Sequence, residues 1–282
     1  MPGPDAAAVT AAARARVTVI VGAGDTGKTT LAAQLASALA ARGARVAVVD
    51  ADVGQSEIGP PTTVGLGSVT RPLARLRDAE VLALEFIGDT SPVRHIGPTA
   101  NATGRLVRRA LAAGFAHVIV DTGGLVEGPL GLALKRAKLA AVDPDLVIVV
   151  QRKDESEPIA RLFDRAERPA VVRVAASDAA TRRTQTQRRQ HRDRALEDYL
   201  RDATAVSVPA DRVEARGPRR APPPAIVEGL LVGILGADGD TLGIGRVRSV
   251  EDRAGTIVIE TPVAPGRIAR IVTGRVVWAG RG

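Results

Sequence analysis

The sequence predicts an α/β protein in which a mostly parallel sheet lies between two layers of helices, followed by a smaller β-rich domain. Between about residues 16 and 208, short β-branched runs alternate with longer segments of helical periodicity. Near-continuous apolar strands of this kind are typical of parallel strands that helices cover on both faces. From residue 225 onward, short Val/Ile runs are separated by glycines and show no helical pattern. This second pattern favours a small β-barrel or an antiparallel β-module.

The expected elements of the first domain alternate along the chain. The expected strands are Val17–Val21, Arg45–Asp50, Val81–Ile87, His117–Asp121, Leu146–Gln151, Ala170–Ala175 and Ala205–Val208. The expected helices are Lys28–Ala41, Thr99–Ala113, Leu130–Ala141, Glu157–Arg168 and Ala179–Arg201. We therefore expect a flexible N-terminus (1–15), an α/β domain (16–210), a Pro/Arg-rich linker (211–224) and a β-rich domain (225–282).

The composition excludes several classes of protein. With 45% apolar and 25% charged residues, the chain resembles a folded globular protein rather than a disordered one. It contains no cysteine, which excludes disulfides, thiolate metal sites and cysteine nucleophiles. No uncharged apolar run approaches the roughly 18 residues that a membrane span needs, and the N-terminal segment lacks the pattern of a signal peptide. We therefore expect a cytoplasmic protein without membrane contact.

The charge of the chain is strongly positive, at +8, and 35 of its 39 Lys and Arg residues are Arg. An excess of Arg has two explanations that the composition alone leaves open. One is a polyanionic partner, because the guanidinium fork matches phosphate oxygens, and the other is a bias in codon usage or toward thermostability. Only five residues are aromatic, so extended stacking of bases on aromatic side chains is not the expected main source of nucleic-acid affinity.

A glycine-rich motif occupies residues 22–30, directly after the first expected strand and at the start of the first expected helix. It matches G-x-x-x-x-G-K-[ST], the P-loop, whose backbone N–H groups and helix dipole bind phosphates. Lys28 is expected to reach the β- and γ-phosphates, and the Thr29 hydroxyl to bind Mg²⁺. The sequence therefore predicts a P-loop NTPase three-layer fold that binds ATP, with GTP or another NTP left open. The residues expected to hold the nucleotide are Gly22, Ala23, Gly24, Asp25, Thr26, Gly27, Lys28, Thr29 and Thr30.

Three carboxylates follow two of the expected strands. Asp50 and Asp52 lie two residues apart at the end of the second strand, so both side chains point to the same side, at the edge where ligands bind in parallel sheets. Asp121 closes the apolar run 117–121, the Walker B pattern in which a strand-end Asp holds Mg²⁺. A kinase needs one carboxylate to accept a hydroxyl proton and another near the metal. A solvated turn, with Asp as a cap, is the alternative for the first pair.

An arginine-rich segment, residues 182–194, opens the last helix expected in the α/β domain. Arg188 and Arg192, four residues apart, share one face of that helix. In a P-loop phosphotransferase such a segment, at about 178–200, would be a lid that supplies Arg to the transferring phosphate. A solvated basic face explains it equally well from the residues alone.

Several segments together resemble one family, the P-loop polynucleotide 5′-hydroxyl kinases of RNA processing, which includes the kinases of pre-mRNA cleavage, tRNA splicing and pre-rRNA processing. In length the chain is similar to the short archaeal and bacterial members. The most specific stretch is D-x-D-x-G-Q-x-x-x-x-P-P within residues 48–67. The other resembling stretches are residues 22–30, 86–92, 118–135, 144–152, 182–200 and 230–247.

The resemblance implies roles for individual residues. Asp52 matches the general base of the family, and Asp50 and Gln55 belong to the same motif. Arg183 and Arg188 fall at the spacing of the two lid arginines. Thr122, Gly123, Gly124 and Leu125 align with a motif, T-x-G-W, that clamps the RNA end, although Leu125 stands where the family has Trp.

These observations together predict an Mg²⁺-dependent kinase that moves the γ-phosphate of ATP to the 5′-hydroxyl end of RNA or DNA. Lys28, Asp52, Arg183 and Arg188 are the expected catalytic residues, and Thr29, Asp50 and Asp121 the expected metal ligands. The expected substrate contacts are Gln55, Thr122, Gly123, Gly124, Leu125 and Arg192. The alternative is a regulatory P-loop NTPase or a GTP-dependent chaperone, which hydrolyses NTP without transfer to nucleic acid.

Overall fold

The structure, a computed structural model, describes residues 5–177, 180–215, 225–251 and 253–280. Five parallel strands form one end of the sheet in the order β7-β6-β1-β5-β2. They are β1 (Val17–Gly22), β2 (Val46–Ala51), β5 (His117–Thr122), β6 (Leu146–Gln151) and β7 (Ala170–Ala175). Two antiparallel strands, β3 (Thr63–Val69) and β4 (Glu80–Phe86), extend the sheet beyond β2.

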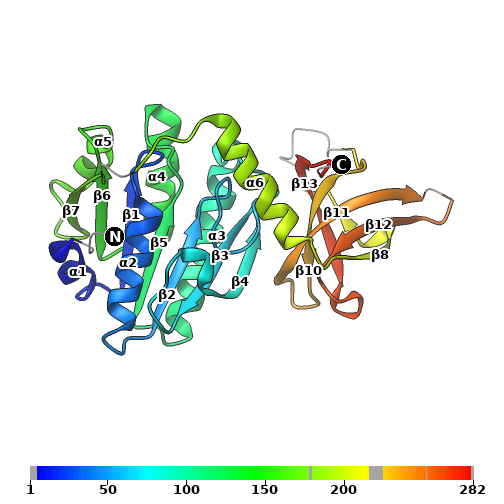
Figure 1. Cartoon of the computed structure of the whole chain (residues 1–282), viewed down its shortest axis with the longest axis horizontal. Helices are drawn as coiled ribbons and strands as arrows, with labels where there is room; N and C mark the ends of the chain where they lie inside the picture. The colour runs from blue at the N-terminus through cyan, green and yellow to red at the C-terminus, as the bar shows by residue number, and fades with distance from the viewer. Residues whose placement is uncertain (1–4, 178–179, 216–224, 252, 281–282) are drawn as a thin grey trace.

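Helices cover both faces of the parallel strands, as Figure 1 shows. The alternation of side chains along β1 explains the two layers, because Val19 and Val21 face one core and Ile20 the other. The first core includes residues of α3 (Ile96–Ala112), α4 (Gly128–Val142) and α5 (Glu157–Ala160), and the second includes residues of α1 (Ala6–Ala12) and α2 (Lys28–Ala40). The expected three-layer α/β fold is therefore confirmed.

A β-rich unit follows the α/β part and shares its sheet. Thr241 of β11 lies opposite Leu84 of β4, and the N–H of Phe86 donates to Thr241 Oγ1 at 3.2 Å. All of its strand pairs are antiparallel except β13 with β9. Its strands are β8 (Thr204–Pro209), β9 (Val213–Glu214), β10 (Leu230–Leu235), β11 (Thr241–Glu251), β12 (Thr256–Thr261) and β13 (Arg270–Val277).

The helix α6 (Gln185–Tyr199) connects the two parts of the molecule. In Figure 1 it runs from the region of α4 to the β-rich unit. Its first turn is a capping box, in which Thr184 Oγ1 accepts from the N–H of Gln187 and the Gln187 side chain accepts from the N–H of Thr184. This box starts the helix at Gln185, whereas the sequence predicted a helix from residue 179, a position outside the described residues.

Three further expectations differ from the structure. Residues 6–12, which we expected to be flexible, form α1, capped by the Asp5 carboxylate and buried through Ala8 and Ala12. The strand expected at 205–208 does not join the parallel sheet, because β8 pairs with β12. The helix expected at 157–168 is reduced to α5 and one 3₁₀ turn, since only Ile159 and Ala160 of these two elements are buried.

The strand β3 was not predicted at all. Its glycines lower its strand propensity, and Gly65 is required because a Cβ at that position would overlap the carbonyl of Ile58. No helix within the described ranges is long and apolar enough to cross a bilayer.

Candidate active site

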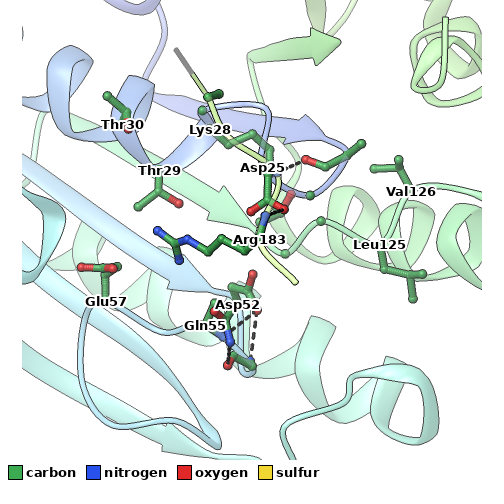
Figure 2. Close-up of a pocket in the computed structure, with 18 of the residues that line it drawn as sticks. Asp25, Lys28, Thr29, Thr30, Asp52, Gln55, Glu57, Leu125, Val126 and Arg183 are labelled. Carbon is green, nitrogen blue, oxygen red and sulfur yellow. Dashed lines mark hydrogen bonds between the residues drawn. The ribbon is translucent and has the colours of Figure 1, made fainter. Parts of the chain in front are cut away.

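The site is an open pocket of about 1460 Å³ at the carboxyl ends of the parallel strands. The P-loop, the ends of β2 and β5, and the start of α6 with the segment before it all contribute to its lining. This is the edge at which ligands bind in open α/β sheets. Figure 2 shows Asp25, Lys28 and Thr29 on one side of the pocket and Asp52, Gln55 and Leu125 on others.

The P-loop has the backbone of a phosphate cradle. Gly27 caps α2 with φ of 91°, a conformation that favours glycine, and Lys28 begins the helix. The Lys28 side chain is buried, and its Nζ donates to the carbonyl of Ala23 at 2.6 Å. Burial lowers the pKa of Lys28, while the carboxylates of Asp121 and Asp52 oppose this shift. The Lys28 ammonium therefore bonds to its own loop, and it lies close enough to Asp121 and Asp52 for both carboxylates to affect its pKa.

Asp121 and Thr29 form the part of the site that fits a divalent cation. The Thr29 hydroxyl donates to Asp121 Oδ2 at 2.6 Å. The other oxygen, Asp121 Oδ1, is buried and has no hydrogen-bond partner among the described residues. Burial raises the pKa of Asp121 to about 6, although Lys28 and the Thr29 hydroxyl act in the opposite direction. A buried carboxylate oxygen that lacks a partner, next to a Thr hydroxyl, matches the oxygen ligands that Mg²⁺ prefers.

Asp50 has a different place from the one expected of a metal ligand. Its Oδ2 accepts from the N–H groups of Glu57 and Ile58 at 2.6 and 3.0 Å and from the Ser56 hydroxyl at 3.3 Å. Its Oδ1 accepts from the N–H of Asp52 at 3.0 Å. Burial and the charge of Asp121 raise the pKa of Asp50 to about 8. Both oxygens are used by the loop 52–58, so Asp50 shapes this loop instead of pointing at a metal.

Asp52 is the carboxylate that the loop presents to the pocket. Its Oδ1 accepts from the N–H groups of Gly54 and Gln55 at 3.0 and 3.1 Å. Its carboxylate packs against Gly123, where a Cβ would lie 3.2 Å from the Asp52 Cγ. The side chain is half-buried and lines the pocket. One oxygen is thus fixed by two backbone donors, while the side chain remains accessible to a ligand.

Gln55 connects the loop to α6. Its Nε2 donates to the carbonyl of Arg188 at 3.2 Å and to that of Gly54 at 2.7 Å. Its Oε1 is buried without a partner. Gln55 therefore lies between the loop that carries Asp52 and the start of α6, and its Oε1 can accept a hydrogen bond from a ligand.

The segment 122–125 has two roles. Thr122, Gly123, Gly124 and Leu125 all line the pocket, as expected for a substrate contact. The Thr122 hydroxyl also bonds into the protein, because it donates to the carbonyl of Ile20 at 2.8 Å. Thr122 thus supports this loop from below, which the sequence motif did not indicate.

The arginine segment closes over the P-loop. Arg188 Nη2 donates to Asp25 Oδ2 at 2.6 Å, and the N–H of Arg183 donates to the same oxygen at 3.0 Å. Burial raises the pKa of Asp25, but the hydrogen bonds from Arg188 and Arg183 outweigh it and hold this pKa below its usual range. The Arg183 side chain points into the pocket in Figure 2, and Arg192 also lines it. This contact favours a lid over a solvated basic face.

The part of the chain that resembles known proteins contains the residues of this pocket. A family model described as "mRNA cleavage and polyadenylation factor CLP1 P-loop" matches residues 22–202, from the first glycine of the P-loop to beyond the end of α6. The match includes the Asp52 loop, Asp121 and the lid. The chain belongs to the CLP1 P-loop family.

Relatives within the CLP1 family are found in archaea and in eukaryotes. The polyribonucleotide 5′-hydroxyl-kinase of Pyrococcus furiosus is 35% identical over 200 residues, which cover 71% of this chain and 54% of that protein. The polyribonucleotide 5′-hydroxyl-kinase Clp1 of Xenopus tropicalis is 30% identical over 199 residues, covering 64% of this chain and 43% of that protein. The chain spans about half the length of the kinase relatives that it matches.

The fold of this CLP1-family chain is also found in a solved structure. The wild-type Clp1p–Pcf11p complex superposes with a TM-score of 0.74 at 15% sequence identity, covering 92% of this chain and 74% of the other. At this identity the likeness shows the fold. The superposition covers 92% of this chain, and so it must include strands of the β-rich unit after residue 204.

Three residues at the site of this CLP1-family chain were not predicted. Arg152 Nη2 donates to the carbonyls of Asp25 and Ala180, both at 2.8 Å, and so joins the P-loop to the lid segment. Lys135 and Lys138 of α4 are buried directly beneath the loops of the site. The rarity of lysine in this Arg-rich sequence could have pointed to these two residues. Its only four lysines are Lys28, Lys135, Lys138 and Lys153, and in the structure all four line the pocket or bond to residues that do.

Proposed function

We propose that this chain is a polynucleotide 5′-hydroxyl kinase, which transfers the γ-phosphate of ATP to the 5′-hydroxyl end of a nucleic acid. The observation that carries this proposal is the position of Asp52. Its carboxylate lines the same pocket as the P-loop, is fixed through one oxygen, and is separate from the Thr29–Asp121 pair that fits a cation. A transfer reaction needs these two carboxylate roles in different places.

The phosphates of ATP would lie over the P-loop. The loop N–H groups and the dipole of α2 would bind the β- and γ-phosphates, and Lys28 would exchange its hydrogen bond with the Ala23 carbonyl for a phosphate oxygen. Thr29 and Asp121 would hold Mg²⁺ through the hydroxyl and the unpartnered Oδ1. A cation there neutralises charge on the phosphates and orients them.

Asp52 would accept the proton of the 5′-hydroxyl as the new O–P bond forms and the bond between the γ-phosphorus and the ADP oxygen breaks. The backbone donors Gly54 and Gln55 keep the carboxylate in one orientation for this step. Arg183 and Arg188 would neutralise negative charge on the transferring phosphoryl group. For this Arg188 must move from Asp25 to the phosphate, because its guanidinium is paired with Asp25 in the structure.

The nucleic-acid end would approach from the side of residues 123–125. Leu125 supplies an apolar contact in place of an aromatic one, so phosphate contacts from Arg192 and the lid would carry more of the affinity. The relatives from Pyrococcus furiosus and Xenopus tropicalis bear the name polyribonucleotide kinase, which favours RNA over DNA as the acceptor.

End-labelling tests the proposal directly. The protein is incubated with Mg²⁺, [γ-³²P]ATP and matched 5′-hydroxyl RNA and DNA oligonucleotides, with the Lys28→Ala variant as the control. Label on the oligonucleotide that depends on Lys28 is the expected result. Label found only in free phosphate would instead identify a regulatory NTPase, and the same assay with [γ-³²P]GTP tests the nucleotide preference.

A further inference from the structure

The inner face of α4 carries two lysines that have no role in the proposed chemistry. Lys135 and Lys138 lie three residues apart, so both point toward the sheet. Their exposed fractions are 0% and 1%, which places them among the most completely buried large side chains of the described residues. Helix faces that pack on a sheet are normally apolar, and fully buried lysines are rare unless they are paired.

Each of the two ammonium groups bonds to a different loop of the site. Lys138 Nζ donates to the carbonyl of Ala51 at 2.6 Å, and Ala51 directly precedes Asp52 in the chain. Lys135 Nζ donates to Thr122 Oγ1 at 2.8 Å and also to the carbonyl of Gly123. Gly123 is the residue against which the Asp52 carboxylate packs. One helix thus holds both the backbone of Asp52 and the surface beside its carboxylate.

Stability alone does not account for these lysines. Moving an ammonium out of water is expensive, and replacing buried charges by apolar side chains of similar volume is often neutral or stabilising. Burial lowers the pKa of Lys138 to about 8 and holds that of Lys135 well below its ordinary value, although Asp52 and Asp121 oppose both shifts. Burial of these two ammonium groups therefore lowers the stability of the folded chain, at positions directly beneath the loops of the site.

The choice of lysine is also informative. The chain uses Arg for 35 of its 39 basic residues, yet these two positions carry Lys. An ammonium is a compact group with three donors, and the Lys135 ammonium uses two of them on Thr122 and Gly123.

We propose that Lys135 and Lys138 are positioning residues that fix the spacing between the Asp52 backbone and the 122–123 loop during phosphoryl transfer. Lys135 is not part of the pocket lining, and Lys138, which borders the pocket, is 1% exposed and gives its ammonium to the carbonyl of Ala51. The inference rests on the proposed function, because it assigns these lysines to the orientation of the proposed base.

Steady-state kinetics of Lys135→Met and Lys138→Met test the proposal, with Arg136→Met as the matched control. Arg136 lies on the same helix but is exposed, so its replacement removes the same charge on the solvent side. We expect kcat for each buried variant to fall about 10- to 100-fold, the cost of misplacing a catalytic group. The KM for the oligonucleotide and the Kd for ATP should change by less than about threefold, because no contact to either ligand is lost.

Thermal unfolding of the same proteins separates positioning from folding. We expect each buried variant to melt within a few degrees of the wild type or above it. A variant that cannot fold, or that loses kcat only in proportion to a lower melting temperature, overturns the proposal. So does a buried variant with the kcat of the wild type.

Chemical rescue gives a second readout. Because the chain has no cysteine, Lys138→Cys can be alkylated with 2-bromoethylamine at this one position in denaturant and refolded, which restores a lysine-like ammonium. We expect aminoethylation, but not carbamidomethylation, to recover most of the lost kcat, relative to wild type taken through the same cycle. Equal activity after the two treatments contradicts the proposal.

The failure of the inference differs from the failure of the proposed function. If the wild type labels no 5′-hydroxyl end, the kinase proposal fails. If the wild type labels ends and the buried variants label them equally fast, only the role of the two lysines fails.

Discussion

At the level of single residues, the two carboxylates at the end of β2 differ in what their oxygens contact. Asp50 is buried and gives both oxygens to donors of its own loop, whereas Asp52 gives Oδ1 to that loop and lines the pocket. The sequence pattern D-x-D placed both residues at one site but did not distinguish them, because the distinction depends on how residues 52–58 fold back over Asp50.

The first prediction concerns the proton acceptor. Asp52→Asn keeps the shape of the side chain and its bonds to Gly54 and Gln55, but removes the acceptor for the 5′-hydroxyl proton. We expect kcat for end-labelling to fall by at least about 10²-fold, with ATP affinity retained. Rates and ATP binding are measured on the same preparation. A loss of only a few-fold would reduce Asp52 to a positioning role.

A second prediction at this scale concerns pH and Lys138. Burial lowers the pKa of this ammonium to about 8, from an ordinary value of 10.5. Between these two pH values the unfolded chain holds a proton that the folded chain has released, so the free energy of unfolding rises as pH increases through this window. We expect urea melts between pH 8 and 10 to show a steeper rise for the wild type than for Lys138→Met. Parallel pH dependence in the two proteins would show that burial does not lower the pKa of Lys138.

At the level of elements, the lid is the part that the sequence predicted only through its resemblance. Periodicity placed Arg188 and Arg192 on one face, but could not say whether that face meets solvent or phosphate. In the structure, Arg188 and the N–H of Arg183 contact Asp25, a P-loop residue more than 150 positions away in the chain. Contacts between residues so far apart in the chain depend on how the whole sheet packs. The periodicity of a short segment does not predict them.

The lid prediction compares arginines on the same element. Arg183→Ala and Arg188→Ala should each lower kcat with little change in the KM of the oligonucleotide, because the proposed contacts strengthen as charge shifts in the transition state. Arg189→Ala is the control, since its side chain is 80% exposed and forms a long ion pair with Asp193 at 3.9 Å. If the losses appear mainly in KM and in a shallower salt dependence of binding, these arginines are general phosphate contacts.

The elements that periodicity did identify were those with long apolar runs. The parallel strands β1, β2, β5, β6 and β7 were all predicted from them, and helices α2, α3 and α4 were found with small shifts at their ends. By contrast, β3 contains Gly65 and Gly67. A side chain at Gly65 would overlap Ile58 of the 52–58 loop, and one at Gly67 would lie against Ile58 and Ala79. The strand β8 pairs with β12, which lies about fifty residues later in the chain, so its place in the sheet could not be predicted from the local sequence.

At the level of the whole molecule, α6 is attached at both ends. Near its start, Arg188 contacts the P-loop through Asp25, and at its end Tyr199 Oη accepts from the N–H of Ile244 in β11 at 3.1 Å. Leu196, one turn earlier, is buried in a cluster shared with Phe86 of β4 and residues of the β-rich unit. The β-rich unit therefore holds the C-terminal end of the helix whose first turns contact the P-loop.

The last prediction tests that support at Gly243. A Cβ at Gly243 would overlap the Tyr199 hydroxyl and lie 2.9 Å from Val263 Cγ2, so Gly243→Ala must push the end of α6 away. We expect it to lower the free energy of unfolding by about 1–3 kcal/mol, as overpacking does, and to lower kcat. Gly266→Ala is the control, because a Cβ there meets no atom within 4 Å. Combining Gly243→Ala with Tyr199→Phe removes the overlapping hydroxyl, so the two effects should be less than additive in urea melts and kinetics. Full additivity would show that Gly243 and Tyr199 act independently, and that the β-rich unit does not hold the lid helix through this contact.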